Sequence, residues 1–156
     1  MNPLSYETNA RGSLKKFLVD AIGDDHITFD RTLAYPDTRE RGEDAVTWWV
    51  NVVFGEMGRD ALADFSIDLY VCTRQDAEGV LLSEKSDLVF SLLTDSSKTD
   101  GMKRIPFYDV SSDPWTELTA MVVQYIYDSP VFDITLPEDE TKVKMLTVLF
   151  RWGAAI

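Results

Sequence analysis

The residues best suited to chemistry lie in the segment GDDHITFD, where the single histidine, His26, stands beside Asp24, Asp25 and Asp30. Imidazole and carboxylate groups at this spacing can bind a metal ion or act together as an acid and a base. A nucleophilic triad also needs an identifiable nucleophile, and the segment offers none. Glycine and aspartate after an apolar helical pattern are typical of a connection. We therefore predict a solvated loop here, and we expect His26→Ala to leave function intact.

Other candidates for chemistry are equally weak. The acidic run LPEDET, residues 136–141, does not have the spacing of an EF-hand loop, so we predict a solvated turn. Cys72 is the only cysteine, which excludes an internal disulfide and zinc sites built from Cys and His ligands. Glycine-rich phosphate motifs and the GxSxG motif are absent from the sequence. The sequence thus predicts no catalytic residues, no cofactor and no metal, and a protein that is not an enzyme.

The composition of the chain argues against two further classes, nucleic-acid-binding and membrane-spanning proteins. The chain has 156 residues and a formal net charge of −12, with 45% hydrophobic residues. An acidic protein of this kind is poorly suited to binding nucleic acid through a broad basic face. The sequence has no apolar run long enough to span a membrane, and we expect a single domain over residues 1–156 in a reducing, cytoplasmic setting.

The helices and strands that would position any site can be predicted from the periodicity of the apolar residues. Helical spacing covers two segments, and alternating or β-branched patterns cover most of the rest. The predicted helices are 4–22 and 76–94, and the predicted strands are 27–35, 46–56, 62–73, 102–110, 115–127 and 142–152. Gly12 weakens the first helix by about 1 kcal/mol relative to alanine, which leaves a start at Ser13 as an alternative to the full range. Pro106 cannot donate a ladder hydrogen bond, which places its strand at an edge or outside the sheet.

This order predicts an α+β fold, with a mostly antiparallel sheet of about four or five strands and two helices packed on one face. Large apolar residues occur on both faces of the strand AVTWWVNVVF, residues 45–54. Two helices cover one face only, so the opposite face is expected either to bind a partner or to be covered by long loops of the same chain. That face would present Trp49 and Val53, then Tyr70 and Cys72, and a third set from 115–127. On that third strand we expect Met121, Val123, Tyr125 and Tyr127 to share this face, or else their neighbours to do so.

Charged and aromatic residues near this face have two interpretations each. Arg151 shares a face with Val143, Met145 and Leu149; it either pairs with an acidic partner or extends its head group to water, and the second is favoured. The four tryptophans could line a sugar or base platform, but core and interface positions are the commoner use. They are Trp48, Trp49, Trp115 and Trp152.

The order of these patterns resembles one known family. A helical N-terminus leads through a variable loop to a hairpin (VTWWVNVVFGE, then ADFSIDLYVCT). A helix follows (EGVLLSEKSDLVFSLLTD), then a short extended RIPFYDV and a long final strand KVKMLTVLFRW. This arrangement, over roughly residues 4–152, is similar to that of the tail terminator, or tail completion, proteins of long-tailed bacteriophages and prophages.

The resemblance implies a non-enzymatic structural protein of the virion tail, assembled in the bacterial cytoplasm. Members of the family form a ring, typically of six subunits, that caps the tail tube and joins it to the head–tail connector. DNA passes through such a ring without specific binding, and no membrane is involved. By position, the loop YPDTRERGED, which includes Arg39 and Arg41, corresponds to an arm that orders on assembly. The expected interface thus includes Trp49, Val53, Tyr70, Tyr125, Arg39, Arg41 and Arg151.

Two other hypotheses remain open from the sequence. The first is a cytoplasmic protein-binding adaptor or immunity-like module that uses the apolar sheet face for one foreign partner. The second is a small-ligand binder or enzyme whose pocket is formed by the aromatic residues and the Asp/His loop.

Overall fold

A computed structural model of the chain describes residues 6–30, 47–59, 62–129, 132–133 and 142–153. The helical elements are α1 (Tyr6–Ile22), η2 (Asp24–His26) and α3 (Val80–Leu92). The strands are β1 (Ile27–Phe29), β2 (Trp48–Arg59), β3 (Leu62–Thr73), β4 (Arg104–Asp109), β5 (Thr116–Asp128), β6 (Phe132–Asp133) and β7 (Lys142–Gly153). The two predicted helices and the long predicted strands are therefore present, within a few residues of the expected bounds.

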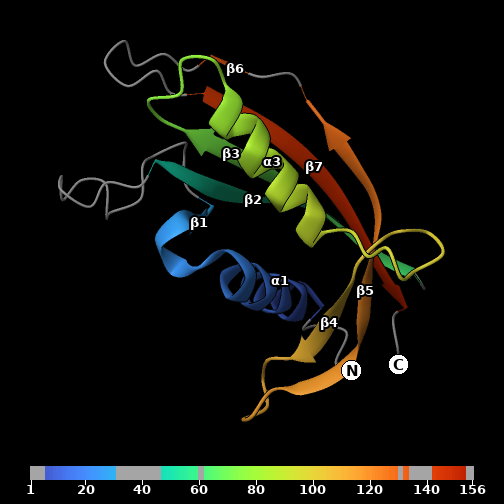
Figure 1. Cartoon of the computed structure of the whole chain (residues 1–156). Coiled ribbons are helices and arrows are strands. Elements are labelled where there is room, and N and C mark those ends of the chain that lie inside the picture. The colour runs from blue at the N-terminus through green and yellow to red at the C-terminus, as the bar shows by residue number, and fades with distance from the viewer. Residues whose placement is uncertain (1–5, 31–46, 60–61, 130–131, 134–141, 154–156) are drawn as a thin grey trace.

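One curled sheet contains all the strands, in the order β1-β2-β3-β7-β5-β4, with β6 paired to β7 (Figure 1). The β1–β2 pair is parallel and the other pairs are antiparallel. The prediction of a hairpin from β2 and β3 is confirmed by their antiparallel register, in which Val50 lies opposite Val71. The sheet has more strands than the predicted four or five because β1 and β6 are short, and short strands leave little periodic signal.

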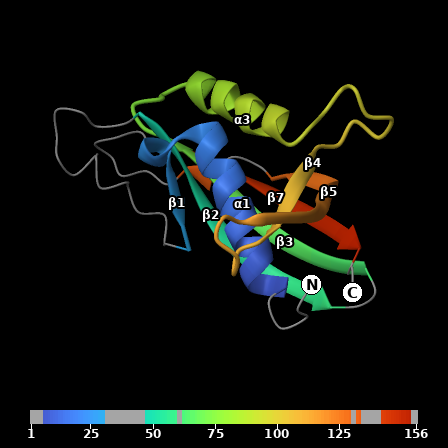
Figure 2. The ribbon, with the colours of Figure 1, turned by 90° about the horizontal axis from the view of Figure 1, so that it is seen from below.

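Both helices pack on the same face of the sheet (Figure 2). Alternate residues of the strands point to this face, because successive side chains of a strand alternate. The core lies between the helices and the sheet and is built from Leu14 and Leu18 of α1, Leu82 and Val89 of α3, and Ile67, Leu69, Val148 and Phe150 of the strands, among others. The predicted fold class, an α+β fold with two helices on one face of a mostly antiparallel sheet, is confirmed.

The alternative start of α1 at Ser13 is wrong, because the helix runs from Tyr6 through Gly12 without a break, close to the predicted range 4–22. A Cβ atom at Gly12 would lie 2.7 Å from Cγ1 of Val110. The glycine therefore lets the helix pack closely on the segment after β4, and this packing offsets the poor helix propensity of glycine.

The edge strand β4 is closed to further strand pairing. Pro106 has no N–H to offer, as the sequence predicted. The N–H of Tyr108 donates to Oγ of Ser13 at 2.9 Å, and the N–H of Val110 donates to Oδ1 of Asn9 at 3.1 Å. Side chains of α1 thus take the place of a neighbouring strand, which protects this edge from unwanted association.

Candidate functional site

The face of the sheet opposite the helices, called the outer face here, carries apolar side chains from four strands around one polar pair, in which Oγ1 of Thr147 donates to Oδ1 of Asp68 at 2.8 Å. The register places Val53 of β2, Tyr70 of β3 and two residues of β7 on this face, and two tyrosines of β5 lie beside them. Two of its members are exposed, Tyr125 at 40% and Tyr127 at 64%, and their rings are 4.7 Å apart. The outer-face patch consists of Val53, Tyr70, Tyr125, Tyr127, Met145 and Leu149.

A bulge in β5 creates the exposed part of this patch. The register between β5 and β7 shifts between Val123 and Tyr125. Before the shift, Met121 and Val123 point into the core; after it, Tyr125 and Tyr127 point outward. The expectation that all four share one face is therefore wrong, because one extra residue reverses the alternation of a strand.

The other end of the outer face is buried. Trp49, Cys72 and Val143 are direct neighbours on β2, β3 and β7, and their exposed fractions are 1%, 0% and 1%. They form a second hydrophobic cluster, separate from the main core, with Tyr70 packed against it. Trp49 was expected to face a partner, but its side chain is buried within the chain and offers no contact surface.

The remaining predicted interface residues fall in different places. Val53 and Tyr70 are half-buried members of the outer-face patch, and Tyr125 is exposed. Arg39 and Arg41 lie outside the described residues. Tyr127, Met145 and Leu149 belong to the patch although they were not among the predicted interface residues. The alternation of KVKMLTVLFRW places the last two on the same face as Arg151.

Arg151 lies on the outer face, next to the patch and directly opposite Asp64 of β3. No ion pair joins these two among the described residues; instead, Oδ1 of Asp64 accepts the N–H of Gly58 at 3.2 Å. Nε of Arg151 is buried and has no hydrogen-bond partner among the described residues. A buried guanidinium N–H without an acceptor is costly. The side chain as a whole is only half-buried, so its guanidinium is suited to receiving a carboxylate from outside.

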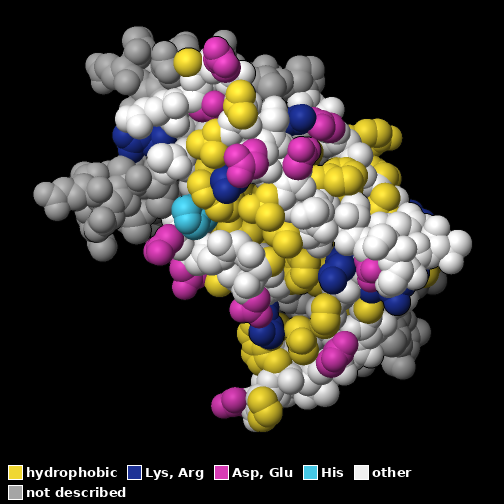
Figure 3. All heavy atoms as spheres, in the orientation of Figure 1, with side chains coloured by type: hydrophobic (Ala, Val, Ile, Leu, Met, Phe, Trp, Pro, Cys, Tyr) yellow, Lys and Arg dark blue, Asp and Glu magenta, His cyan; other side chains and the backbone are white. Residues whose placement is uncertain are grey.

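Exposed apolar side chains also occur on the helix side, but they do not form one surface, because Leu88 and Phe90 are two positions apart and point to different flanks of α3. Val80, Leu88 and Phe90 of α3 are exposed at 67%, 41% and 44%. Figure 3 shows hydrophobic side chains along α3 and in the seam between α3 and α1. The molecule thus has exposed apolar residues on both sides of one sheet, and the two sets share no residue.

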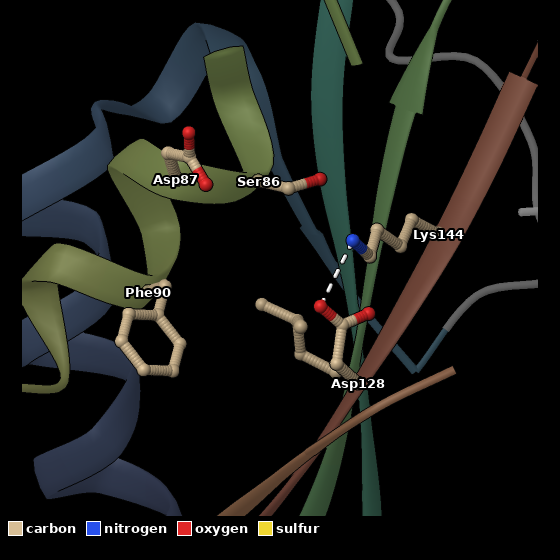
Figure 4. A pocket seen from close by; sticks show the side chains of 6 residues that line it. Ser86, Asp87, Phe90, Asp128 and Lys144 are labelled. Carbon is tan, nitrogen blue, oxygen red and sulfur yellow. Dashed lines mark ion pairs between the residues drawn. The ribbon is translucent and has the colours of Figure 1, made fainter. Parts of the chain in front are cut away.

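A shallow depression of about 230 Å³ lies between α3 and the strands β5 and β7 (Figure 4). Nζ of Lys144 is 2.9 Å from Oδ2 of Asp128 across its floor. Ser86 is 4% exposed, and its hydroxyl points from α3 toward this ion pair but has no hydrogen-bond partner among the residues that the structure describes. Asp87 and Phe90 stand on the helix side of the depression. Two carboxylates and one ammonium give the depression a net negative charge.

His26 is not in a solvated loop, which corrects the expectation from the sequence. Its ring stacks on Trp48, with centroids 4.4 Å apart, and its Nδ1 lies 3.0 Å from the Trp48 carbonyl oxygen. Asp30 does not join it, because its Oδ2 pairs with Nη1 of Arg11 at 2.6 Å. Lys85 lies over the Trp48 ring at 4.8 Å. These contacts favour a packing role, since the aromatic and cationic groups cover Trp48.

The described residues contain no chemistry that suggests catalysis. Burial raises the pKa of Cys72 to about 12, so its thiol stays protonated and is a poor nucleophile at neutral pH. No group of three or more His, Cys, Asp or Glu side chains within the described segments is placed to hold a metal ion. None of the described helices has the length and apolar character needed to cross a membrane.

Comparisons with known proteins do not assign the chain. No protein-family model matches it, and no curated protein matches it. The interpretation of the site therefore depends on its geometry. Exposed apolar residues lie on both sides of the sheet, those of the outer face beside Arg151, which makes no ion pair among the described residues, and Phe90 of the helix side beside an acidic depression.

Proposed function

We propose that this protein is a structural subunit that assembles with copies of itself into a closed ring, as a tail terminator of a phage or prophage does. The observation that carries the proposal is that exposed aromatic residues lie on both sides of the sheet, Tyr125 and Tyr127 on the outer face and Phe90 on the helix side. A ring contact is heterologous, which means that each subunit presents one surface to one neighbour and a different surface to the other. The outer-face patch on one side and the Phe90 flank of α3, which borders the depression, on the other meet that requirement.

The fold supports the proposal in a second way. The resemblance described above implies an α+β domain, and the chain has one, with its helices confined to one face. Strand addition at β4 is blocked, so association through side chains of the two faces is favoured over association through that edge. In the proposed tail, the ring caps the tube and meets the head–tail connector.

The charge of the chain suits a channel through which DNA moves. Each subunit carries a formal charge of −12, and an acidic wall does not retain phosphates as a basic wall would. Repulsion between like-charged subunits must then be overcome by apolar contacts, with screening by salt over about 8 Å at physiological ionic strength. Exposed aromatic residues such as Tyr127 and Phe90 are the side chains that commonly dominate such contacts.

The test is the mass of the purified protein across a concentration series, measured by light scattering and native mass spectrometry. We expect one discrete oligomer, several times 17.7 kDa, in equilibrium with the monomer. Tyr127→Glu and Phe90→Glu should each weaken association by about tenfold or more, because each places a charge in an apolar contact. Mixing these two variants should restore dimers, since each still has one intact surface.

The matched control is Ser96→Glu, which adds the same charge in the exposed turn after α3 and should assemble like the wild type. A wild-type mass of 17.7 kDa at every concentration would refute the ring. A stable one-to-one complex with a foreign protein, with no self-association, would instead support the adaptor hypothesis.

A further inference from the structure

The acidic depression beside α3 has the features of a receiving site for a cationic side chain. Its lining includes the carboxylates of Asp87 and Asp128, with a single ammonium, Lys144, which is already paired with Asp128. Asp87 is exposed and makes no ion pair among the described residues. A guanidinium or ammonium entering the depression would therefore find an unpaired carboxylate.

Two further groups of the depression point to a ligand. The hydroxyl of Ser86 is buried, has no hydrogen-bond partner and is aimed into the depression. Buried polar atoms usually have partners in folded proteins, so this oxygen is a candidate acceptor for an incoming N–H. Phe90, which is 44% exposed, stands beside it and can contact a cation through its ring face.

The chain itself carries a suitable cation on the opposite side of the sheet. Arg151 lies beside the outer-face patch, its Nε is buried without a hydrogen-bond partner, and it makes no ion pair among the described residues. A guanidinium can donate to a carboxylate through two N–H groups and stack on an aromatic ring at the same time. Arg151 thus lacks a carboxylate and an aromatic ring to contact, and the depression offers both.

We propose that, in the assembled protein, Arg151 of one copy docks into the depression of the next copy, where it pairs with Asp87 and contacts Phe90 and Ser86. This inference rests on the proposed self-assembly and names the polar contact that fixes its register. The occupant is a second copy of this chain, because the donor and the acceptor lie on opposite faces of the same sheet and cannot meet within one molecule.

The test is a charge exchange between the two ends of the contact. Arg151→Glu and Asp87→Arg should each weaken self-association by about tenfold or more, because each brings like charges together. The double variant Arg151→Glu/Asp87→Arg should recover most of the wild-type association. An equimolar mixture of the two single variants should recover it as well, since one contact is then native and the next is reversed. Sedimentation velocity measures all four.

Controls separate this contact from loss of the fold and from the ring itself. Lys98→Glu makes the same charge change in an exposed turn and should assemble normally. Arg151→Gln keeps the aliphatic stem and removes the charge, so it should weaken association while its melting temperature stays near that of the wild type. If the wild type assembles and the charge exchange fails to rescue, the Arg151 contact is refuted and the ring stands. If the wild type is monomeric at every concentration, both are refuted.

Discussion

The two ends of the outer face share the strands β2, β3 and β7, with β5 added at the exposed end, yet their environments are opposite. At one end, Trp49, Cys72 and Val143 form a row that is almost completely buried. At the other end, the exposed Tyr125 and Tyr127 lie beside residues of β7 that are only half-buried. Alternation along a strand decides which face a side chain joins, but it does not decide whether that face is covered.

The difference divides the face into a part that stabilises the fold and a part that is available for association. A buried aromatic residue contributes to folding through the apolar area removed from water, about 25 cal/mol per Å². An exposed aromatic residue contributes little to folding. It can contribute a similar free energy to binding when another molecule covers it. Substitutions at the two ends should therefore separate stability from assembly.

The largest effect on stability is expected at the buried end. Trp49→Glu would place a carboxylate in a cluster where the indole is 1% exposed, at a cost of several kcal/mol. Because small domains are stable by only about 5–15 kcal/mol, we expect an unfolded or partly folded protein. Far-UV circular dichroism and urea denaturation measure this directly. Tyr127→Glu, the same change on the same face, is the control and should fold normally.

A folded Trp49→Glu variant with the urea midpoint of the wild type would show that this end is open to water. The comparison between the two ends would then no longer hold, and the whole outer face would be an interaction surface, as the sequence pattern first suggested.

Alkaline pH should cause a smaller loss of stability at the buried end of the outer face, through Cys72. Burial raises the pKa of its thiol from 9.0 in the unfolded chain to about 12 in the folded protein, because the interior disfavours the thiolate. The contribution of this group to stability is complete below pH 9.0 and falls as the pH rises toward about 12. The loss approaches about 1.4 kcal/mol per pH unit within that window.

Cys72→Ala isolates this contribution, since other groups titrate in the same pH range. The difference in free energy of unfolding between wild type and variant should shrink as the pH rises above 9.0. A difference that stays constant from pH 8 to pH 11 would show that the thiol titrates normally, and so that the cluster is hydrated. Reaction with a thiol reagent at neutral pH should likewise require unfolding.

The sequence predicted the fold better than it predicted the site, for identifiable reasons. Long periodic segments such as 62–73 carry a strong signal, and β3 matches that range. The bulge in β5 leaves no signal of its own, so the faces of Met121 and Tyr125 could not be separated from the pattern. Trp49 faces away from the helices, as predicted. Its burial depends on tertiary packing, which the alternation of apolar and polar residues does not predict.

Contacts between side chains distant in the sequence were also beyond prediction. His26 was assigned to a solvated loop from its neighbours, whereas the parallel pairing of β1 with β2 brings it onto Trp48. The depression beside α3 combines residues of that helix with residues of β5 and β7 that lie about 40 to 60 positions further along the chain, and no local pattern marks it. By contrast, Pro106 was placed correctly at an edge because the missing N–H is a local property.

The smallest effect on stability is expected at the exposed end, where it sharpens the comparison most. Tyr127→Ser removes a ring that is 64% exposed and whose centroid lies 4.7 Å from that of Tyr125. The free energy of unfolding should therefore change by about 0.5 kcal/mol or less. Self-association should nevertheless weaken, because the same ring belongs to the proposed contact surface. Urea denaturation at low protein concentration reports the first quantity, and sedimentation velocity at high concentration reports the second. A loss of several kcal/mol with unchanged association would assign Tyr127 to the fold, and the outer face would then be structural along its whole length.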